Sequence, residues 1–139
     1  MFENPTKSDI DAFLRRIRVI AILGLSGTAG RPSHTVARAL QKFGYRIVPI
    51  NPTVPEVLGE RAWKDLDAAI AGAGPVDVVE VFRRPEHVAQ IVEDCIRLKV
   101  PALWLQEGVI DEAAANRARA AGIFTVMNRC MFRERSTLS

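Results

Sequence analysis

The sequence predicts an α/β protein with one open parallel sheet, and two observations lead to that prediction. Short apolar runs alternate with amphipathic segments along the chain, and only a few residues connect one to the next. The first run, residues 18–24, is apolar throughout its interior and ends in a glycine, as strands covered on both faces often do. Alternating strands and helices pair in parallel through right-handed crossovers. We therefore predict a Rossmann-like fold with three α/β/α layers, in a single domain that spans residues 1–139.

Five strands follow from the apolar runs. In the less regular segment 54–74 we expect a short strand near residues 60–62, followed by a helix. We expect the strand order 3-2-1-4-5, with helices on both faces of the sheet. The five predicted strands are residues 18–24, 46–51, 76–82, 102–106 and 124–128.

The helices are predicted from apolar residues three and four positions apart, which share one helix face. The segment 85–98 shows the pattern clearly and places Cys95 on the apolar face as a buried residue. Asp111 suits the N-cap of the last predicted helix, and Gly122 suits its C-terminal end. An N-terminal segment, 1–17, contains a helix before the sheet, and residues 133–139 are expected to form a C-terminal tail. The predicted helices are residues 9–17, 33–43, 65–71, 85–98 and 111–121.

Composition excludes several classes of protein. The 139 residues are 48% hydrophobic with a net charge of +3, a balance that disordered chains do not show. The longest stretch without a charge, residues 19–30, is too short to span a bilayer, which takes about 20 apolar residues. Basic residues occur in small groups beside few aromatic ones, which argues against nucleic-acid binding. Two cysteines and no signal-like N-terminus favour a reduced cytoplasmic protein without a metal site.

The loop after the first predicted strand, residues 24–33, suits an anionic ligand. In open α/β sheets a ligand binds outside the carboxyl ends of the strands, where the strand order reverses. Glycines at 24, 27 and 30 allow positive φ angles, and Pro32 suits the first position of the following helix. The free N–H groups of that helix and the Arg31 guanidinium could hold phosphate oxygens. The alternative is a plain strand–helix turn, in which Gly24 only forms the turn and Ser33 only caps the helix.

Two common phosphate-binding motifs fit this loop poorly. A Walker loop needs a Gly-Lys pair, which the sequence lacks. The dinucleotide fingerprint needs glycine at its first, third and sixth positions, and counting from Gly24 the last two are Ser26 and Ala29. The second predicted strand ends in Asn51, where an NAD-binding protein usually carries an acid. NAD is therefore disfavoured, although it stays open.

Residues at the strand ends resemble a known family. The chain is similar to the small stand-alone CoA-binding proteins, which are single-domain relatives of the N-terminal CoA-binding domain of the succinyl-CoA synthetase α subunit. The resemblance runs from about residue 18 to residue 132 and implies that coenzyme A lies across the strand ends. The motifs that carry it are, in order, Gly24-x-Ser26, Arg31-Pro32-Ser33, Asn51-Pro52, Val76-Asp77, Phe82-Arg83-Arg84-Pro85, Trp104-Leu105-Gln106 and Arg129-Cys130.

The resemblance also implies a role for each loop. The residues from Ser26 to Ser33 would face the pyrophosphate, Asn51 and Pro52 would flank the adenosine, and Phe82 with Arg83 would line the far wall. Gln106-Glu107 matches the Thr-Glu pair of the synthetase. Asn128 departs from the aspartate that the small family usually carries there, which removes a carboxylate that could fix Arg129. The expected cofactor-binding residues are Gly24, Ser26, Gly27, Thr28, Arg31, Pro32, Ser33, Asn51, Pro52, Phe82, Arg83, Gln106 and Glu107.

No catalytic set is predicted. His34 and His87 each fall in the first turn of a predicted helix without a paired nucleophile, and the phosphorylated histidine of succinyl-CoA synthetase belongs to a second domain. We therefore predict a non-enzymatic module that binds CoA or an acyl-CoA. Cys130, between Arg129 and Arg133, has two interpretations: a thiol that forms a mixed disulfide with CoA, or a small buried hydrophobe.

Three alternative functions stay open at this point. A nicotinamide-dependent oxidoreductase or one subunit of an acyl-CoA synthetase would each need a partner chain. A ligand-sensing regulator would need a helix-turn-helix, and a single helix precedes the predicted sheet. A monomer and a homodimer through the apolar faces of the outer helices are both compatible with the sequence, and neither nucleic acid nor membrane is expected as a partner.

Overall fold

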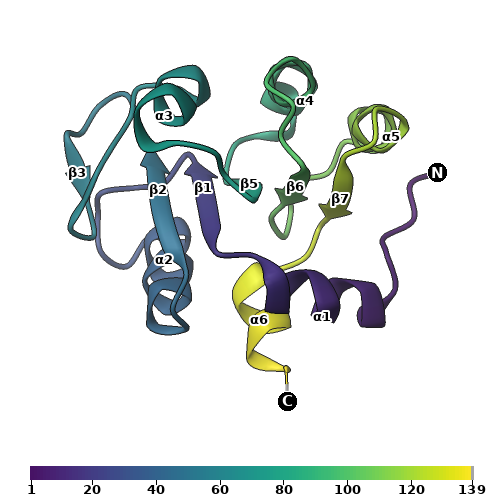
Figure 1. Cartoon of the computed structure of the whole chain (residues 1–139), viewed down its shortest axis with the longest axis horizontal. Coiled ribbons are helices and arrows are strands. Elements are labelled where there is room, and N and C mark those ends of the chain that lie inside the picture. Colours follow the sequence, from purple (N-terminus) through teal and green to yellow (C-terminus); the bar gives the residue numbers. More distant parts are fainter. Residues whose placement is uncertain (139) are drawn as a thin grey trace.

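A computed structural model describes residues 1–138, in which one parallel sheet lies between two layers of helices (Figure 1). The sheet contains five strands in the order β2-β1-β5-β6-β7, and a separate antiparallel hairpin lies beyond β2. The strands are β1 (Val19–Leu23), β2 (Arg46–Ile50), β5 (Val78–Val81), β6 (Ala102–Leu105) and β7 (Phe124–Met127), and the hairpin consists of β3 (Glu56–Val57) and β4 (Glu60–Arg61).

The helices cover both faces of this sheet, which confirms the predicted three-layer, Rossmann-like domain. One set of helices lies on one face of the sheet and a second set lies on the other (Figure 1). The first set is α3 (Leu66–Ala73), α4 (Val88–Arg97) and α5 (Glu112–Ala120), with a 3₁₀ turn, η1 (Pro85–His87), leading into α4. The second set is α1 (Lys7–Arg16), α2 (Pro32–Lys42) and α6 (Met131–Ser136).

The predicted strand order 3-2-1-4-5 is wrong. Counted along the chain, the five strands of the main sheet lie in the order 2-1-3-4-5, because β5 pairs with β1 rather than with β2. The segment after β2 pairs with the outer edge of β2 at an isolated bridge between Ile50 and Trp63, and the predicted short strand forms the hairpin strand β4 rather than a strand of the main sheet. Helix α3 then crosses back over the sheet and brings β5 to the other side of β1. The order therefore reverses between β1 and β5.

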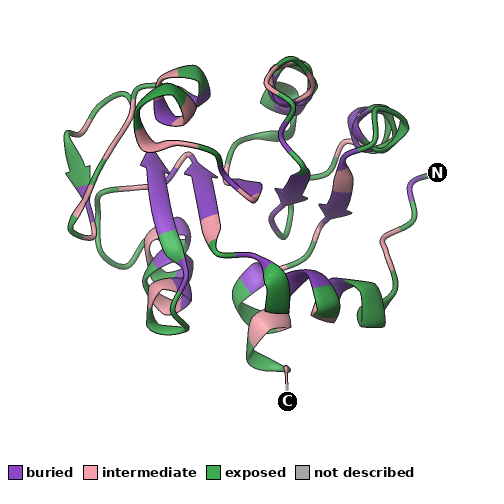
Figure 2. Cartoon of the chain, viewed as in Figure 1, coloured by how far each residue is buried: buried purple, intermediate pink, exposed green. Residues whose placement is uncertain are grey.

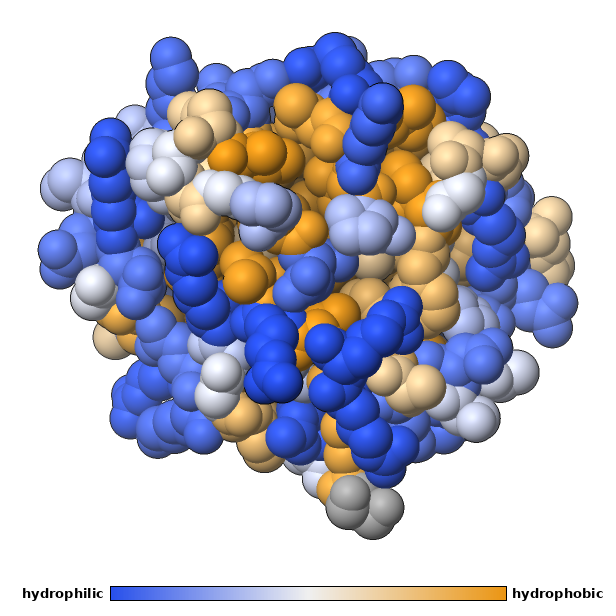
Figure 3. All heavy atoms as spheres, in the orientation of Figure 1, coloured by the Kyte–Doolittle hydropathy of each residue, from blue (hydrophilic) through white to orange (hydrophobic). Residues whose placement is uncertain are grey.

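Apolar side chains fill both spaces between the sheet and the helices. Buried residues concentrate in the strands and on the inner sides of the helices (Figure 2). Trp104 of β6 is fully buried and stacks on Phe13 of α1, whereas Cys95 lies in the core on the α4 side. Burial raises the pKa of the Cys95 thiol to about 12, which confirms Cys95 as a core residue. In the space-filling view hydrophilic residues outline the molecule, and hydrophobic ones gather in the upper centre of the face shown (Figure 3).

The helix ends match the sequence signals except at the C-terminus. Asp111 accepts a hydrogen bond from Ala114 N, and Gly122 follows α5 with a φ of 90°, so both predicted end signals are confirmed. The segment 133–139, predicted as a tail, contributes most of helix α6, which packs beside α1. Ser139 lies outside the described residues.

Candidate functional site

Two cavities adjoin at the carboxyl ends of the strands. The first, here called the α3–α4 cavity, has a volume of about 460 Å³ and lies between the ends of β1, β2 and β5 and the starts of α3 and α4. The second, here called the α2 cavity, measures about 480 Å³ and lies between the loop after β1, the start of α2 and the loops after β5 and β6. Gly24, Phe82 and Arg83 line both cavities, so one extended ligand could reach from one into the other.

Gly24 is where the loops after β1 and β5 come closest. Its φ is 82°, and a Cβ built on it would collide with the carbonyl oxygen of Phe82 and lie 3.0 Å from Cδ of Arg83. The left-handed backbone and the close approach each require a glycine. The absence of a side chain at this position keeps the passage between the two cavities open.

The other two loop glycines differ from each other. Gly30 has a φ of 92°, as predicted, and a Cβ there would meet no atom within 4 Å. Gly27 does not use the positive φ that a glycine allows, and a Cβ built on it would lie 3.4 Å from Val54. Gly27 and Thr28 line neither cavity, because the middle of the loop turns toward the segment after β2.

The two serines of the loop are joined to each other. Ser33 is buried, and its Oγ accepts a hydrogen bond from the backbone N–H of Ser26 at 2.9 Å, while Ser26 Oγ accepts from Thr28 N at 3.0 Å. Ser33 is thus not a helix cap, because α2 begins at Pro32 with Arg31 in the N-cap position. These bonds hold the loop against the start of α2, and both serines line the α2 cavity.

The start of α2 is open to an anion. Thr6, Asp65 and Asp111 cap α1, α3 and α5 with their side chains, but no side chain caps α2, and its first turn contains no acidic residue. Pro32 occupies the first helical position, as predicted. The unsatisfied N–H groups and the positive end of the helix dipole therefore face the α2 cavity, which favours a phosphate or carboxylate there.

Asn51 joins the loops after β1 and β2. Its Nδ2 donates to the carbonyl oxygen of Leu25 at 2.9 Å, and its Oδ1 accepts from both the N–H and the hydroxyl of Thr53, at 2.8 and 2.7 Å. Asn51 and Pro52 line the α3–α4 cavity, as the resemblance implies for an adenosine site. The amide oxygen of Asn51 is already engaged twice, so its main role is to hold the two loops together.

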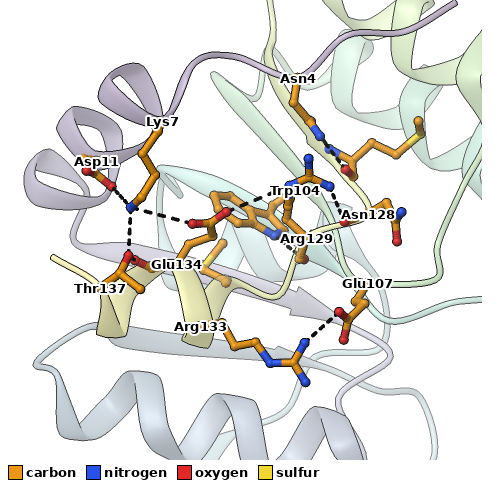
Figure 4. A network of polar contacts seen from close by, with 12 residues as sticks. Asn4, Lys7, Asp11, Trp104, Glu107, Asn128, Arg129, Arg133, Glu134 and Thr137 are labelled. Carbon is orange, nitrogen blue, oxygen red and sulfur yellow. Dashed lines mark hydrogen bonds and ion pairs between the residues drawn. The ribbon is translucent and has the colours of Figure 1, made fainter.

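Beyond β6, the loop that carries Gln106 and Glu107 is attached to α6. Gln106 is buried, and its Oε1 accepts from Met131 N at 3.4 Å, while Glu107 pairs with Arg133 at 2.7 Å. Figure 4 shows Arg133 and Glu107 pointing toward each other across the gap between the two elements. Both predicted residues line the α2 cavity, but the carboxylate of Glu107 is already ion-paired with Arg133. Helix α6, which the sequence did not predict, therefore holds the loop that lines one end of the α2 cavity.

Asn128 and Arg129 lie behind this end of the site (Figure 4). Asn128 has a φ of 60°, and its Oδ1 accepts from Gly108 N at 2.9 Å, so it joins the loops after β6 and β7. Arg129 donates to the Asn128 carbonyl oxygen at 2.9 Å, and its Nε lies 4.0 Å from Glu134. These two contacts orient Arg129 although the residue before it is not an aspartate.

Cys130 is half-buried at the start of α6 and lines neither of the two cavities. It belongs to a smaller cavity of about 370 Å³ that touches the α2 cavity through Glu107. The Glu107–Arg133 pair lies where these two spaces meet.

Positive charge dominates the lining of the α2 cavity, where Arg31, Arg83 and Arg84 outnumber Glu107. In the α3–α4 cavity, by contrast, Lys64 and Arg83 balance Asp65 and Asp94. Arg31 and Arg83 are exposed, and within residues 1–138 neither has an ion pair or a side-chain hydrogen bond. Arg84 makes only a loose pair with Glu86 at 3.7 Å. The carboxylates nearby already have partners, since Glu107 pairs with Arg133 and Asp65 accepts a hydrogen bond from Ala68 N. An anionic ligand would find unpaired guanidinium groups here, which form charge-assisted hydrogen bonds.

Sequence reasoning missed two features. Lys64 lines the α3–α4 cavity, but it lies in the irregular segment after β2, where the sequence pattern gave no fixed geometry. Glu80, in the middle of β5, is completely buried with no partner for either oxygen among the described residues. The sequence signal for Glu80 was a charged residue inside an otherwise apolar strand. His87, which the sequence placed in the first turn of a helix without a paired nucleophile, also lines the α3–α4 cavity.

Across the described chain, no helix is long and apolar enough to cross a membrane. Over the same residues, 1–138, no three His, Cys, Asp or Glu side chains are grouped so that they could hold a metal ion.

Comparisons with known proteins agree with this geometry. Residues 18–136 match the protein family described as a CoA binding domain. The chain is 37% identical over 132 residues to the uncharacterized protein YneT of Bacillus subtilis, covering 93% of each chain. A solved structure of a hypothetical protein from Pyrococcus horikoshii has a TM-score of 0.88 at 31% identity, covering 99% of both chains. A structure from Thermus thermophilus has a TM-score of 0.87 at 31% identity, covering 95% of this chain and 98% of that one.

Proposed function

The chain belongs to the CoA-binding domain family, and we propose that it binds coenzyme A or an acyl-CoA across the carboxyl ends of β1, β5 and β6 without a catalytic set of its own. The observation that supports this proposal most directly is the pair of adjoining cavities joined over Gly24. CoA is an extended molecule with an anionic centre, so it needs a long crevice with a cationic middle. We further expect the protein to work in the cytoplasm.

The α2 cavity suits the pyrophosphate. The uncapped start of α2 offers backbone N–H donors, and Arg31 stands beside them as the N-cap residue with an unpaired guanidinium. Ser26 and Ser33 line the same cavity, and the hydroxyl proton of Ser33 is free to donate because its oxygen is the acceptor for Ser26 N. Phe82, half-buried between the cavities, supplies an apolar wall for the rest of the ligand.

The alternatives receive less support from the same residues. In an NAD site an acidic side chain at the end of the second strand accepts from the ribose hydroxyls. The corresponding Asn51 oxygen already accepts two hydrogen bonds from Thr53. A role as an acyl-CoA synthetase subunit would require a histidine from a partner chain, since His34 lies half-buried on α2 and His87 stands alone in the α3–α4 cavity. A regulatory role would use the same ligand site and needs an additional effector surface.

Calorimetric titration with CoA, acetyl-CoA, NAD and ATP tests the proposal. CoA or acetyl-CoA is expected to bind with a stoichiometry of one, and NAD and ATP to bind more weakly. Tighter binding of NAD than of CoA would overturn the proposal in favour of the dinucleotide alternative. The same titrations followed by mass spectrometry of the recovered CoA test for turnover, which the proposal does not expect.

Arg31→Ala is expected to weaken CoA binding about tenfold to a hundredfold. A hydrogen bond to an ionised group contributes about 1.5–3 kcal/mol, and each 1.4 kcal/mol is a factor of ten in Kd. Arg31→Lys should restore only part of the affinity, because an ammonium group cannot reproduce the planar two-pronged contact. The measurement is calorimetry at low salt, and the unfolding midpoint should hardly change because Arg31 is exposed.

The matched control is Arg38→Ala, which removes the same charge from an exposed position on α2 that lines neither cavity. Its Kd for CoA should stay within about twofold of the wild type, since isolated surface charges contribute little. Equal losses of CoA affinity in Arg31→Ala and Arg38→Ala would mean that Arg31 acts only through the overall positive electrostatic potential of the protein. Unchanged affinity in Arg31→Ala would move the phosphate contact to Arg83.

A further inference from the structure

The α3–α4 cavity combines an apolar floor with two cationic side chains and a histidine, which come from three different elements. Leu23, Ile50 and Ile91 are buried core residues that also form part of the floor. Lys64 precedes α3, Arg83 follows β5, and His87 ends η1, so these three side chains come from different segments around the cavity. Within the described chain none of the three has an ion-pair partner.

The acids of this cavity are already engaged. Asp65 Oδ1 accepts from Ala68 N at 2.8 Å as the cap of α3. Asp94 Oδ1 accepts from Gln90 Nε2 at 3.1 Å and from Arg97 at 3.2 Å. The carboxylates therefore have fixed structural partners, whereas the cations do not. The lining of the cavity therefore suits a ligand with a planar apolar group and an anionic substituent.

The family resemblance already implies an adenosine beside Asn51 and Pro52, which line the α3–α4 cavity. We infer that Lys64, which lines the same cavity, binds the 3′-phosphate of that adenosine and makes the protein select CoA over ligands without the 3′-phosphate. This inference rests on the proposed function, since it assumes that the pyrophosphate lies in the α2 cavity. The adenine would lie on the apolar floor beside Asn51 and Pro52. The 3′-phosphate would then face the cations at the rim, a contact that NAD, ATP and dephospho-CoA cannot make.

Lys64 is the residue whose substitution tests the α3–α4 cavity without disturbing the α2 cavity. Arg83 lines both cavities, so its removal would disturb the pyrophosphate contact as well. Lys64 lines the α3–α4 cavity and a small neighbouring one but not the α2 cavity. Arg31 shows the opposite pattern and lines only the α2 cavity. Substitutions at these two positions should therefore have different effects on ligands with and without the 3′-phosphate.

The test is a calorimetric comparison of CoA with dephospho-CoA in the wild type, Lys64→Met and Arg31→Ala. Wild type should bind CoA about tenfold or more tightly than dephospho-CoA, in line with one or two charge-assisted contacts. Lys64→Met should lose about threefold to tenfold in affinity for CoA and none for dephospho-CoA. Arg31→Ala should weaken both ligands by the same factor, because both contain the pyrophosphate. Lys42→Met removes the same charge from an exposed position away from both cavities and should change neither Kd.

Failure of the inference differs from failure of the proposed function. If no titration detects CoA binding, the proposed function is wrong. If CoA binds but dephospho-CoA binds equally well, the function stands and the inference is overturned. Equal weakening of both ligands by Lys64→Met would also overturn it, since Lys64 would then not face the 3′-phosphate.

Discussion

Glu80→Gln is expected to abolish most of the decrease in the free energy of unfolding that the wild-type protein shows between about pH 5 and pH 8. Glu80 lies within β5, where Ile22 and Trp104 are its partners in the neighbouring strands. Its side chain is completely buried, and neither carboxyl oxygen has a hydrogen-bond partner among the described residues. Desolvation raises the pKa of Glu80 to about 8, so the folded protein carries it as a neutral acid at pH 7.

The direction of the pH dependence follows from the extra proton of the folded state. An unfolded chain ionises this glutamate near its ordinary pKa of about 4.3, whereas the folded chain keeps the proton up to a pKa of about 8. Between these values the free energy of unfolding should fall by about 1.4 kcal/mol per pH unit, on the order of 4–5 kcal/mol in all. The contribution is fully present below the unfolded pKa and is lost as pH rises through the folded pKa. A glutamine has no proton to lose, so its stability should stay nearly constant over this range.

Urea unfolding followed by circular dichroism from pH 5 to pH 8.5 measures the effect. Glu80→Met serves as a second variant, since it fills a similar volume without a polar group and should be equally insensitive to pH. Glu56→Gln, at an exposed position, should keep the wild-type slope. The exposed carboxylates Asp67 and Glu93 do not interfere, because hydrogen bonds from Arg97 and Arg117 lower their pKa values below this window. A wild-type slope retained in both Glu80 variants would contradict the assignment.

The strands and helices of this fold could be predicted because burial leaves a periodic pattern in the sequence. A strand covered on both faces, such as β1, is apolar throughout, and an amphipathic helix such as α4 repeats its apolar residues with the helical period. The order of the strands leaves no such pattern. Whether β5 lies beside β2 or beside β1 depends on how the irregular segment and α3 pack, and that is a property of the folded chain.

The same distinction applies to the site. Gly24, Arg31 and Phe82 could be placed together from sequence, since parallel strands bring their carboxyl ends to one edge of the sheet. Lys64 could not, because its position depends on the irregular segment that turns back along β2. Helix α6 was missed because its six residues, Met131–Ser136, are too few for a helical period to stand out. As a result, the Arg133 partner of Glu107 was not foreseen.

Gly24→Ala is expected to destabilise the protein by about 2–4 kcal/mol and to weaken CoA binding even when the variant is fully folded. Two effects combine at this position. An alanine with φ near 82° costs about 1–2 kcal/mol because its Cβ crowds the backbone. Its Cβ would also collide with the Phe82 carbonyl oxygen and lie 3.1 Å from the carbonyl carbon, so the end of β5 must shift. Urea midpoints and calorimetry with CoA at low denaturant measure the two effects.

Gly30→Ala separates these two effects, because it lies in the same loop with a φ of 92° but has no atom within 4 Å of an added Cβ. It should show only the backbone cost, about 1 kcal/mol, and nearly wild-type affinity. The difference between the two variants then reports the close approach of β1 and β5 alone. That approach is also the passage between the α2 and α3–α4 cavities, so displacing Phe82 and Arg83 should cost affinity as well as stability. If both variants had the same stability and the same Kd for CoA, the prediction would be contradicted. The end of β5 would then shift to accommodate the added Cβ at no cost, and ligand binding across the two cavities would not depend on Gly24.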